Sequence, residues 1–225
     1  MSKPIADIIK SRISTRAFTN EPVTEDTVRE LLEVARWAPS GGNLQPWQVH
    51  VVTGKARDRL IQLVQSAIAE NPFGDESEIS VYPKGLQEPY RTRRYSVAEE
   101  MYALLDIPRD DKPARLNHLT RNFKFFDAPV GLFFSLDRAF DRGQWAHLGM
   151  FMQTLSLAAE EIGLATCMQE AWCTRASTVS AFLNLKESEQ LYCGMALGYP
   201  DKSAKVNKLR SKRAAIDEFT TFVEK

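Results

Sequence analysis

Three polar side chains near the start of the chain alternate along the short segment Arg12-Ile-Ser-Thr-Arg16. In an extended backbone every second side chain points to the same side, so Arg12, Ser14 and Arg16 would face one way. Two guanidinium groups and a hydroxyl group form charge-assisted hydrogen bonds with an anion. The spacing therefore allows an anion site, although solvated surface arginines beside a helix-capping serine are the commoner arrangement of such residues.

A second polar segment, residues 38–47, combines a helix stop, a tight turn at Gly41 and Gly42, and the start of a strand. Asn43 and Gln45 can present amide groups there. A turn requires glycine and asparagine, but nothing about turning requires serine, glutamine and tryptophan in the same stretch. A binding loop and a plain turn are both open interpretations.

Several common catalytic signatures do not occur. The sequence has no G-x-G-x-x-G, G-x-x-x-x-G-K-[ST], H-E-x-x-H or G-x-S-x-G pattern, which argues against a Rossmann site, a P-loop, a zincin and an α/β-hydrolase. His50, His118 and His147 stand far apart, and His50 lies in a strand pattern, where a hydrogen-bonded imidazole is commoner than a ligand. We assign no histidine to a site and expect no metal centre.

Composition and charge narrow the class of protein further. The 225 residues include 29 Lys and Arg and 29 Asp and Glu, so a net charge of 0 gives no long-range attraction to nucleic acid. The 3 cysteines lack C-x-x-C spacing, and no disulfide is expected. Neither a signal-peptide core nor an apolar run of about 18 residues occurs, which predicts a cytoplasmic protein without a membrane span.

The elements that must position these segments follow from hydrophobic periodicity and from the positions of proline and glycine. Helices are predicted over 24–37, 55–70, 97–105, 113–125, 145–162 and 177–184, and strands over 47–53, 130–136, 165–170 and 191–199. These elements interleave without a regular βαβ rhythm. The strand over 130–136 is apolar on both faces, which is typical of a central strand.

Two further regions are distinctive. Proline, glycine, tyrosine and arginine interrupt any period over 71–94, which predicts a long loop or lid. The helix over 145–162 is nearly apolar around its circumference, which predicts that it is buried in the core or in a subunit interface. The charged tail over 203–225 carries no periodic pattern.

Several segments together resemble the FMN-dependent nitroreductase family. They are RISTRAF (12–18), EPV (21–23), ARWAPSGGNLQPW (35–47), LGMFMQTLSLAAEEIGLAT (148–166), QEAW (169–172), GMALGYP (194–200) and LRSKR (209–213). Their order and spacing match the family as well as their residues do, and the likeness extends over nearly the whole chain. The region 71–126 is the part that the likeness does not cover.

The resemblance implies an α+β fold with a central, mostly antiparallel sheet flanked by helices. It also implies a single nitroreductase-like domain over 1–225, with a variable lid at about 71–126. Two such chains would form an interlocked homodimer with two FMN sites at the interface. The buried helix over 145–162 agrees with this arrangement.

The resemblance also implies cofactor contacts, residue by residue. Arg12 and Ser14 should meet the FMN phosphate region and Arg16 the flavin ring. The glycine turn should reach the flavin of the other subunit through Pro39, Ser40, Gly41 and Asn43. Gln169, Glu170 and Ala171 should pass the reactive edge of the ring, and Arg213, with Arg210, should close on the phosphate. Ser211 stands where relatives carry a cation, so whether Arg210 or Lys212 assists is open.

The function that follows is that of an NAD(P)H oxidoreductase, with NADH or NADPH as reductant. It would reduce a small aromatic acceptor, a nitroaromatic and also a quinone, by two-electron ping-pong steps. The flavin does the chemistry, so no side chain is named as catalytic. Tyr95 and Phe123 are predicted to line the substrate space. Reductive dehalogenation, another flavin oxidoreduction, and FMN binding without turnover are the alternatives.

Overall fold

Four strands form one antiparallel sheet in the computed structural model of the chain, which describes residues 4–72, 74–75 and 77–224. In spatial order they are β1 (Gln48–Thr53), β2 (Val130–Asp137), β4 (Glu189–Gly198) and β3 (Ala165–Gln169). All residues of β2 except the last are buried. The predictions of an antiparallel sheet, and of a central strand over 130–136, are confirmed.

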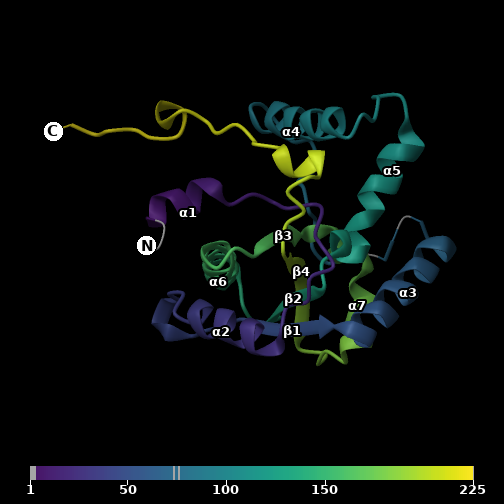
Figure 1. Cartoon of the computed structure of the whole chain (residues 1–225). Helices are drawn as coiled ribbons and strands as arrows, with labels where there is room; N and C mark the ends of the chain where they lie inside the picture. The colour runs from purple at the N-terminus through teal and green to yellow at the C-terminus, as the bar shows by residue number, and fades with distance from the viewer. Residues whose placement is uncertain (1–3, 73, 76, 225) are drawn as a thin grey trace.

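The two faces of the sheet are covered by different helices (Figure 1). These helices are α2 (Glu25–Ala35) and α6 (Arg142–Glu161) on one face, and α3 (Gly54–Glu70) and α7 (Ala176–Leu183) on the other. Because side chains alternate along a strand, Leu132 and Phe134 of β2 pack with α2 and α6, whereas Phe133 packs with α3 and Trp172. The α+β fold class is therefore confirmed.

The remaining helices lie beyond the sheet: α1 (Ile5–Ser11), α4 (Tyr90–Leu104) and α5 (Lys112–Thr120). The prediction of a loop up to residue 94 was wrong at its end, because α4 begins directly after Pro89. α4 has no buried residue, so it lacks the apolar stripe that would have revealed it. Residues 73 and 76 of that predicted loop lie outside the described residues.

The helix predicted over 113–125 ends earlier, at Thr120, and continues as the 3-10 segment η2 (Arg121–Asp127). Phe125 and Phe126 have φ angles of 53° and 51°, which a right-handed helix does not allow. Both rings are fully buried, and the ring of Phe125 occupies the space where a side chain at Gly131 would lie. A regular helix therefore cannot include Phe125 and Phe126, whose rings pack in the core.

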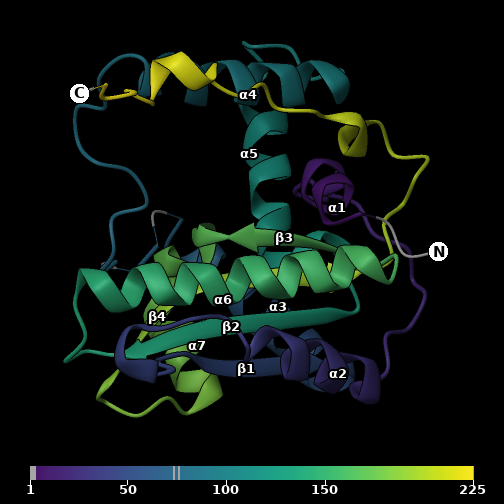
Figure 2. The ribbon, with the colours of Figure 1, turned by 90° about the vertical axis from the view of Figure 1, so that its left-hand side faces the viewer.

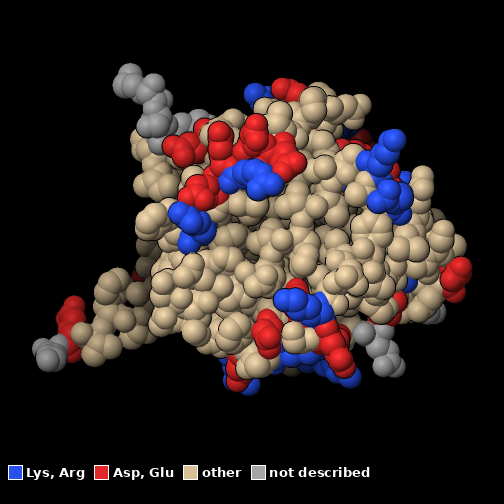
Figure 3. All heavy atoms as spheres, turned by 90° about the horizontal axis from the view of Figure 1, so that it is seen from below, with Lys and Arg blue, Asp and Glu red and all other residues tan. Residues whose placement is uncertain are grey.

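Apolar side chains remain uncovered on a single chain. α6 crosses the front of Figure 2 and buries one side, while its outer side exposes Ala146, Gly149 and Met150. The C-terminal segment extends away from the sheet (Figure 1) and exposes Phe219 and Phe222. Seen from below, where α2 and β1 lie, charged side chains are grouped at the margins of a broad uncharged area (Figure 3).

Among the described residues no helix is long and apolar enough to cross a membrane.

Candidate functional site

The segment 12–16 runs beside β3 in an extended conformation. Ser14 forms a parallel bridge with Thr166, and the Thr15 amide donates to the Thr166 carbonyl at 3.0 Å. Thr15 is buried, whereas Arg12, Ser14 and Arg16 are half-buried. Within the segment threonine is therefore the buried residue, and the three polar residues keep part of their surface exposed.

Asn207 ties this segment to the C-terminal part of the chain. Its Oδ1 accepts from the Arg16 amide at 2.8 Å, and its Nδ2 donates to the carbonyls of Ala17 at 2.8 Å and Asp201 at 2.9 Å. One side-chain amide thus satisfies three backbone groups. Sequence reasoning missed Asn207, because a single asparagine in a charged tail has no distinguishing pattern.

The arginines expected at the cofactor have no carboxylate partner within the part of the chain that the structure describes. Arg12 Nε is buried without a hydrogen-bond partner, and Arg16 Nη1 donates to the Ser14 carbonyl at 3.1 Å. Arg210 and Arg213 donate only to oxygens of residues 207–212. A buried unpaired donor costs roughly 1–3 kcal/mol. Phosphate oxygens would supply the missing acceptors, so these residues fit the expected FMN.

The segment 169–171 begins at the last residue of β3, three residues after the residue that bridges to Ser14. The Gln169 side chain is turned inward, where its Nε2 donates to the Asn122 carbonyl at 2.8 Å and its Oε1 accepts from Trp172 Nε1 at 3.4 Å. Its amide is therefore engaged inside the protein. Glu170 and Ala171 are half-buried, which leaves them partly accessible to a cofactor.

Glu170 is held in place by a tyrosine that the sequence did not single out. The Tyr192 hydroxyl donates to Glu170 Oε1 at 3.0 Å. Burial, and next the charge of Glu170, raise the pKa of Tyr192 above its usual range. The hydroxyl therefore stays protonated and keeps donating to the carboxylate.

The glycine turn is built as a short 3-10 segment, η1 (Gly41–Asn43). Gly42 has a φ angle of 58°, which favours glycine, and Ser40 Oγ accepts from the Gln45 amide at 2.9 Å. The Gly41 amide donates to Nε2 of His147 on α6 at 3.2 Å. This bond requires the neutral imidazole with its proton on Nδ1. His147, which we assigned to no site, thus positions the turn.

The glycine turn and helix α1, which leads directly into the segment 12–16, contact opposite ends of α6 (Figure 2). Ser11, next to Arg12, donates to Glu160 Oε1 at 2.8 Å, whereas the turn contacts His147. A helix rises about 1.5 Å per residue, so the two contacts lie roughly 20 Å apart along the axis. This separation favours the expectation that the turn serves the cofactor of a second chain.

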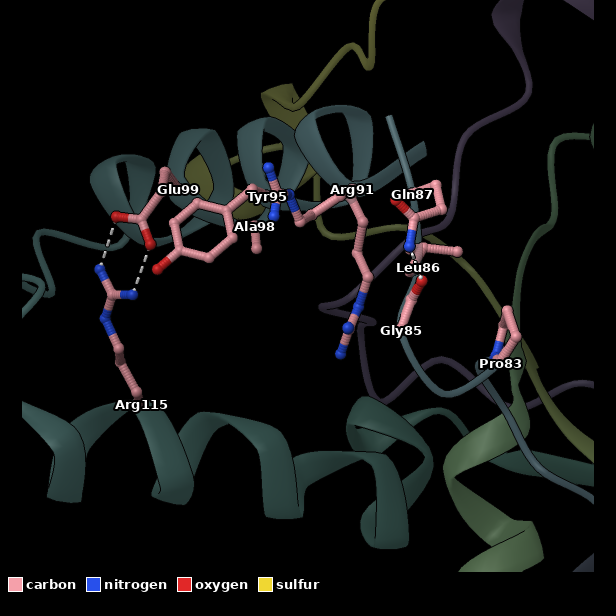
Figure 4. A pocket seen from close by; sticks show the side chains of 10 residues that line it. Pro83, Gly85, Leu86, Gln87, Arg91, Tyr95, Ala98, Glu99 and Arg115 are labelled. Atoms are coloured by element: carbon pink, nitrogen blue, oxygen red, sulfur yellow. Dashed lines mark hydrogen bonds and ion pairs between the residues drawn. The ribbon is translucent and has the colours of Figure 1, made fainter. Parts of the chain in front are cut away.

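A cavity of about 570 Å³ lies between the loop before α4, α4 itself and α5 (Figure 4). Tyr95, one of the two rings predicted to line the substrate space, points into it. Phe123, the other, is 7% exposed and packs edge-on against Trp172, with ring centroids 5.3 Å apart. The structure therefore places Phe123 in the core rather than at this cavity.

Comparisons with known proteins agree with these observations. The sequence profile of the nitroreductase family matches residues 9–199. A nitrobenzene nitroreductase of Ectopseudomonas oleovorans is 38% identical to this chain, over 97% of this chain and 96% of the relative. A 4-nitrobenzoate reductase of Pseudomonas putida is also 38% identical, over 96% of this chain and 94% of the relative. The crystal structure of an FMN- and NADPH-dependent nitroreductase from Sphigopyxis sp. strain HMH superposes with a TM-score of 0.96 at 39% identity, covering 99% of this chain and 100% of the other.

Proposed function

This chain belongs to the nitroreductase family, and we propose that it is an FMN-dependent oxidoreductase that uses NADH or NADPH to reduce nitroaromatic compounds. The observation that carries the proposal is the segment 12–16, where Arg12 Nε is buried without a hydrogen-bond partner among the described residues and where Ser14 and Arg16 stay partly exposed. The similarity to nitroaromatic reductases along nearly the full chain supports it.

In this proposal Arg12, Ser14, Arg210 and Arg213 hold the FMN phosphate region, and Arg16 lies at the flavin ring. Glu170 and Ala171 follow the ring edge, with Tyr192 fixing the carboxylate of Glu170. Bound FMN supplies hydride transfer from the nicotinamide to the acceptor in two alternating half-reactions. No side chain is assigned a proton-transfer role, because water can protonate the product oxygens.

We also propose that two chains form a homodimer and that each FMN contacts both. Pro39, Ser40, Gly41 and Asn43 would then meet the flavin of the partner subunit. The distance between this turn and the segment 12–16 supports the arrangement, as does the apolar outer side of α6. Each chain would form one domain, with α4 and α5 as its lid.

The proposed function is tested by the absorption spectrum of the purified protein. We expect a yellow protein that releases FMN rather than FAD on denaturation. Its flavin absorbance should bleach with NADH or NADPH under anaerobic conditions and return on adding nitrobenzene. A protein that cannot be reconstituted with FMN contradicts the proposal. Bound FMN that does not bleach would leave only FMN binding, and bleaching without reoxidation by any nitroaromatic would leave an oxidoreductase with another acceptor.

Tyr95 and Phe123 should respond differently to replacement by alanine. Loss of the Tyr95 ring should change acceptor efficiency several-fold, because aromatic pairs contribute about 0.5–1.5 kcal/mol beyond burial. Loss of the buried Phe123 ring should instead lower the free energy of unfolding by about 3–5 kcal/mol. Urea unfolding and both anaerobic half-reactions measure the two effects. If both half-reactions keep wild-type rates in the Tyr95→Ala variant, Tyr95 does not line the substrate space.

A further inference from the structure

One face of α4 forms a wall of the cavity between α4 and α5 (Figure 4). Arg91, Arg94, Tyr95 and Ala98 recur at the three- and four-residue spacing of a helix face, and all four line the cavity. α4 has no buried residue, so this face does not pack against the core. Its polar side chains are therefore available to a ligand.

Two of the three arginines that line the cavity have their charge satisfied within the chain. Arg91 Nε donates to Glu88 Oε1 at 2.7 Å. Arg115 forms a two-bonded pair with Glu99, at 2.7 and 2.9 Å, and these hydrogen bonds lower the pKa of Glu99. Figure 4 shows the Arg115 pair at one end of the cavity.

Arg94 is the third, and it has no carboxylate partner among the residues that the structure describes. Its guanidinium group lies over the ring of Tyr82, 3.9 Å from the ring centroid. This contact orients the group without neutralising its charge. Among the described residues, Arg94 is therefore the arginine of the cavity lining whose charge no carboxylate neutralises.

Tyr95 supplies an aromatic surface beside this cation. Its hydroxyl accepts from Arg109 Nη2 at 2.8 Å, and the Arg109 guanidinium lies 5.3 Å from its ring centroid. The ring is thereby held in place at the cavity wall. An aromatic ligand with an anionic substituent would find both a ring and a guanidinium partner here.

The α5 wall connects the cavity to the proposed cofactor site. Arg115 lines the cavity, and His118 follows one turn later on α5. His118 is buried, and burial together with the charges of Arg121 and Arg16 lowers its pKa to about 4. Arg16, proposed to lie at the flavin ring, is therefore near the end of the same helix.

We propose that Arg94 binds the carboxylate of the acceptor, so that the preferred substrates are nitroaromatic compounds with an anionic substituent. This inference rests on the proposed function and names its substrate class. A guanidinium group and a carboxylate form paired hydrogen bonds of defined geometry. A volume of about 570 Å³ lies within the range of small-molecule sites.

The test compares 4-nitrobenzoate with its uncharged methyl ester in the holoenzyme. In the Arg94→Gln variant we expect KM for 4-nitrobenzoate to rise about 10-fold or more, as for loss of a hydrogen bond to a charged group. KM for the ester should stay unchanged, and Arg94→Lys should recover part of the loss. The matched control is Arg93→Gln on the same helix, because Arg93 pairs with Glu218 and does not line the cavity.

Equal changes for acid and ester would overturn the inference, because Arg94 would then only shape the cavity. A rise in KM for NADPH but not for NADH, with both acceptors unaffected, would also overturn it by assigning Arg94 to the reductant. Titration of the oxidised holoprotein with 4-nitrobenzoate gives a second readout that needs no turnover. If binding weakens in Arg94→Gln but the native enzyme reduces neither compound, Arg94 still binds the carboxylate, whereas the proposed function fails and the substrate class fails with it.

Discussion

Replacement of Arg12 by alanine is expected to weaken FMN binding about 10- to 150-fold, the range for losing a hydrogen bond to a charged group. Arg12 Nε is buried and has no protein acceptor among the described residues, so a phosphate oxygen of FMN would give it the acceptor it lacks. Quenching of FMN fluorescence on titration with apoprotein measures the dissociation constant directly.

Arg29→Ala is the matched control for this prediction. Arg29 is an exposed arginine on α2 that pairs with Glu25 at 2.6 Å, far in sequence from the segment 12–16. Its removal should leave FMN affinity unchanged. An unchanged dissociation constant in Arg12→Ala would return Arg12 to the class of solvated surface arginines.

Replacement of Met150 by glutamate is expected to convert the proposed dimer to monomers and to release most of the FMN. Met150 is 45% exposed on the outer side of α6, where a partner subunit would cover it. A carboxylate buried there without a partner costs several kcal/mol. Sedimentation velocity at micromolar concentration measures the association, and the absorbance of the purified protein measures the bound flavin.

Leu63→Glu provides a control with nearly the same starting exposure. Leu63 is 44% exposed on α3, which lies on the opposite face of the sheet from α6. This variant should remain dimeric and yellow. If Met150→Glu also remains a dimer with full FMN content, α6 does not form the subunit interface.

The elements with strong local patterns could be predicted from the sequence. α2 has a threonine cap and an apolar stripe, and β2 is apolar on both faces, so each pattern reports how its element is buried. α4 could not be located in this way, because it packs no side chain into the core. The positive φ angles at Phe125 and Phe126, whose rings are buried, are likewise not revealed by any local period.

The candidate site shows the same division. The segments 12–16 and 38–47 could be singled out as candidates from the sequence, because they contain residue types that turns and strands do not require. Asn207 and His147 could not be singled out in this way. Asn207 bonds to Arg16, 191 positions away, and His147 bonds to Gly41, 106 positions away. A single polar residue carries no sequence signal for such a contact. The sequence therefore indicates which groups meet a ligand more readily than which groups hold them there.

The hydrogen bond between Gly41 and His147 links the turn to the helix whose outer side would face the partner subunit. In the proposed dimer, cofactor affinity and subunit association are therefore coupled quantities. Thermodynamic linkage makes this coupling reciprocal, because a ligand held by both chains stabilises their association by as much as association tightens the ligand. In the proposed dimer the apoprotein would consequently dissociate into subunits more readily than the FMN-bound form.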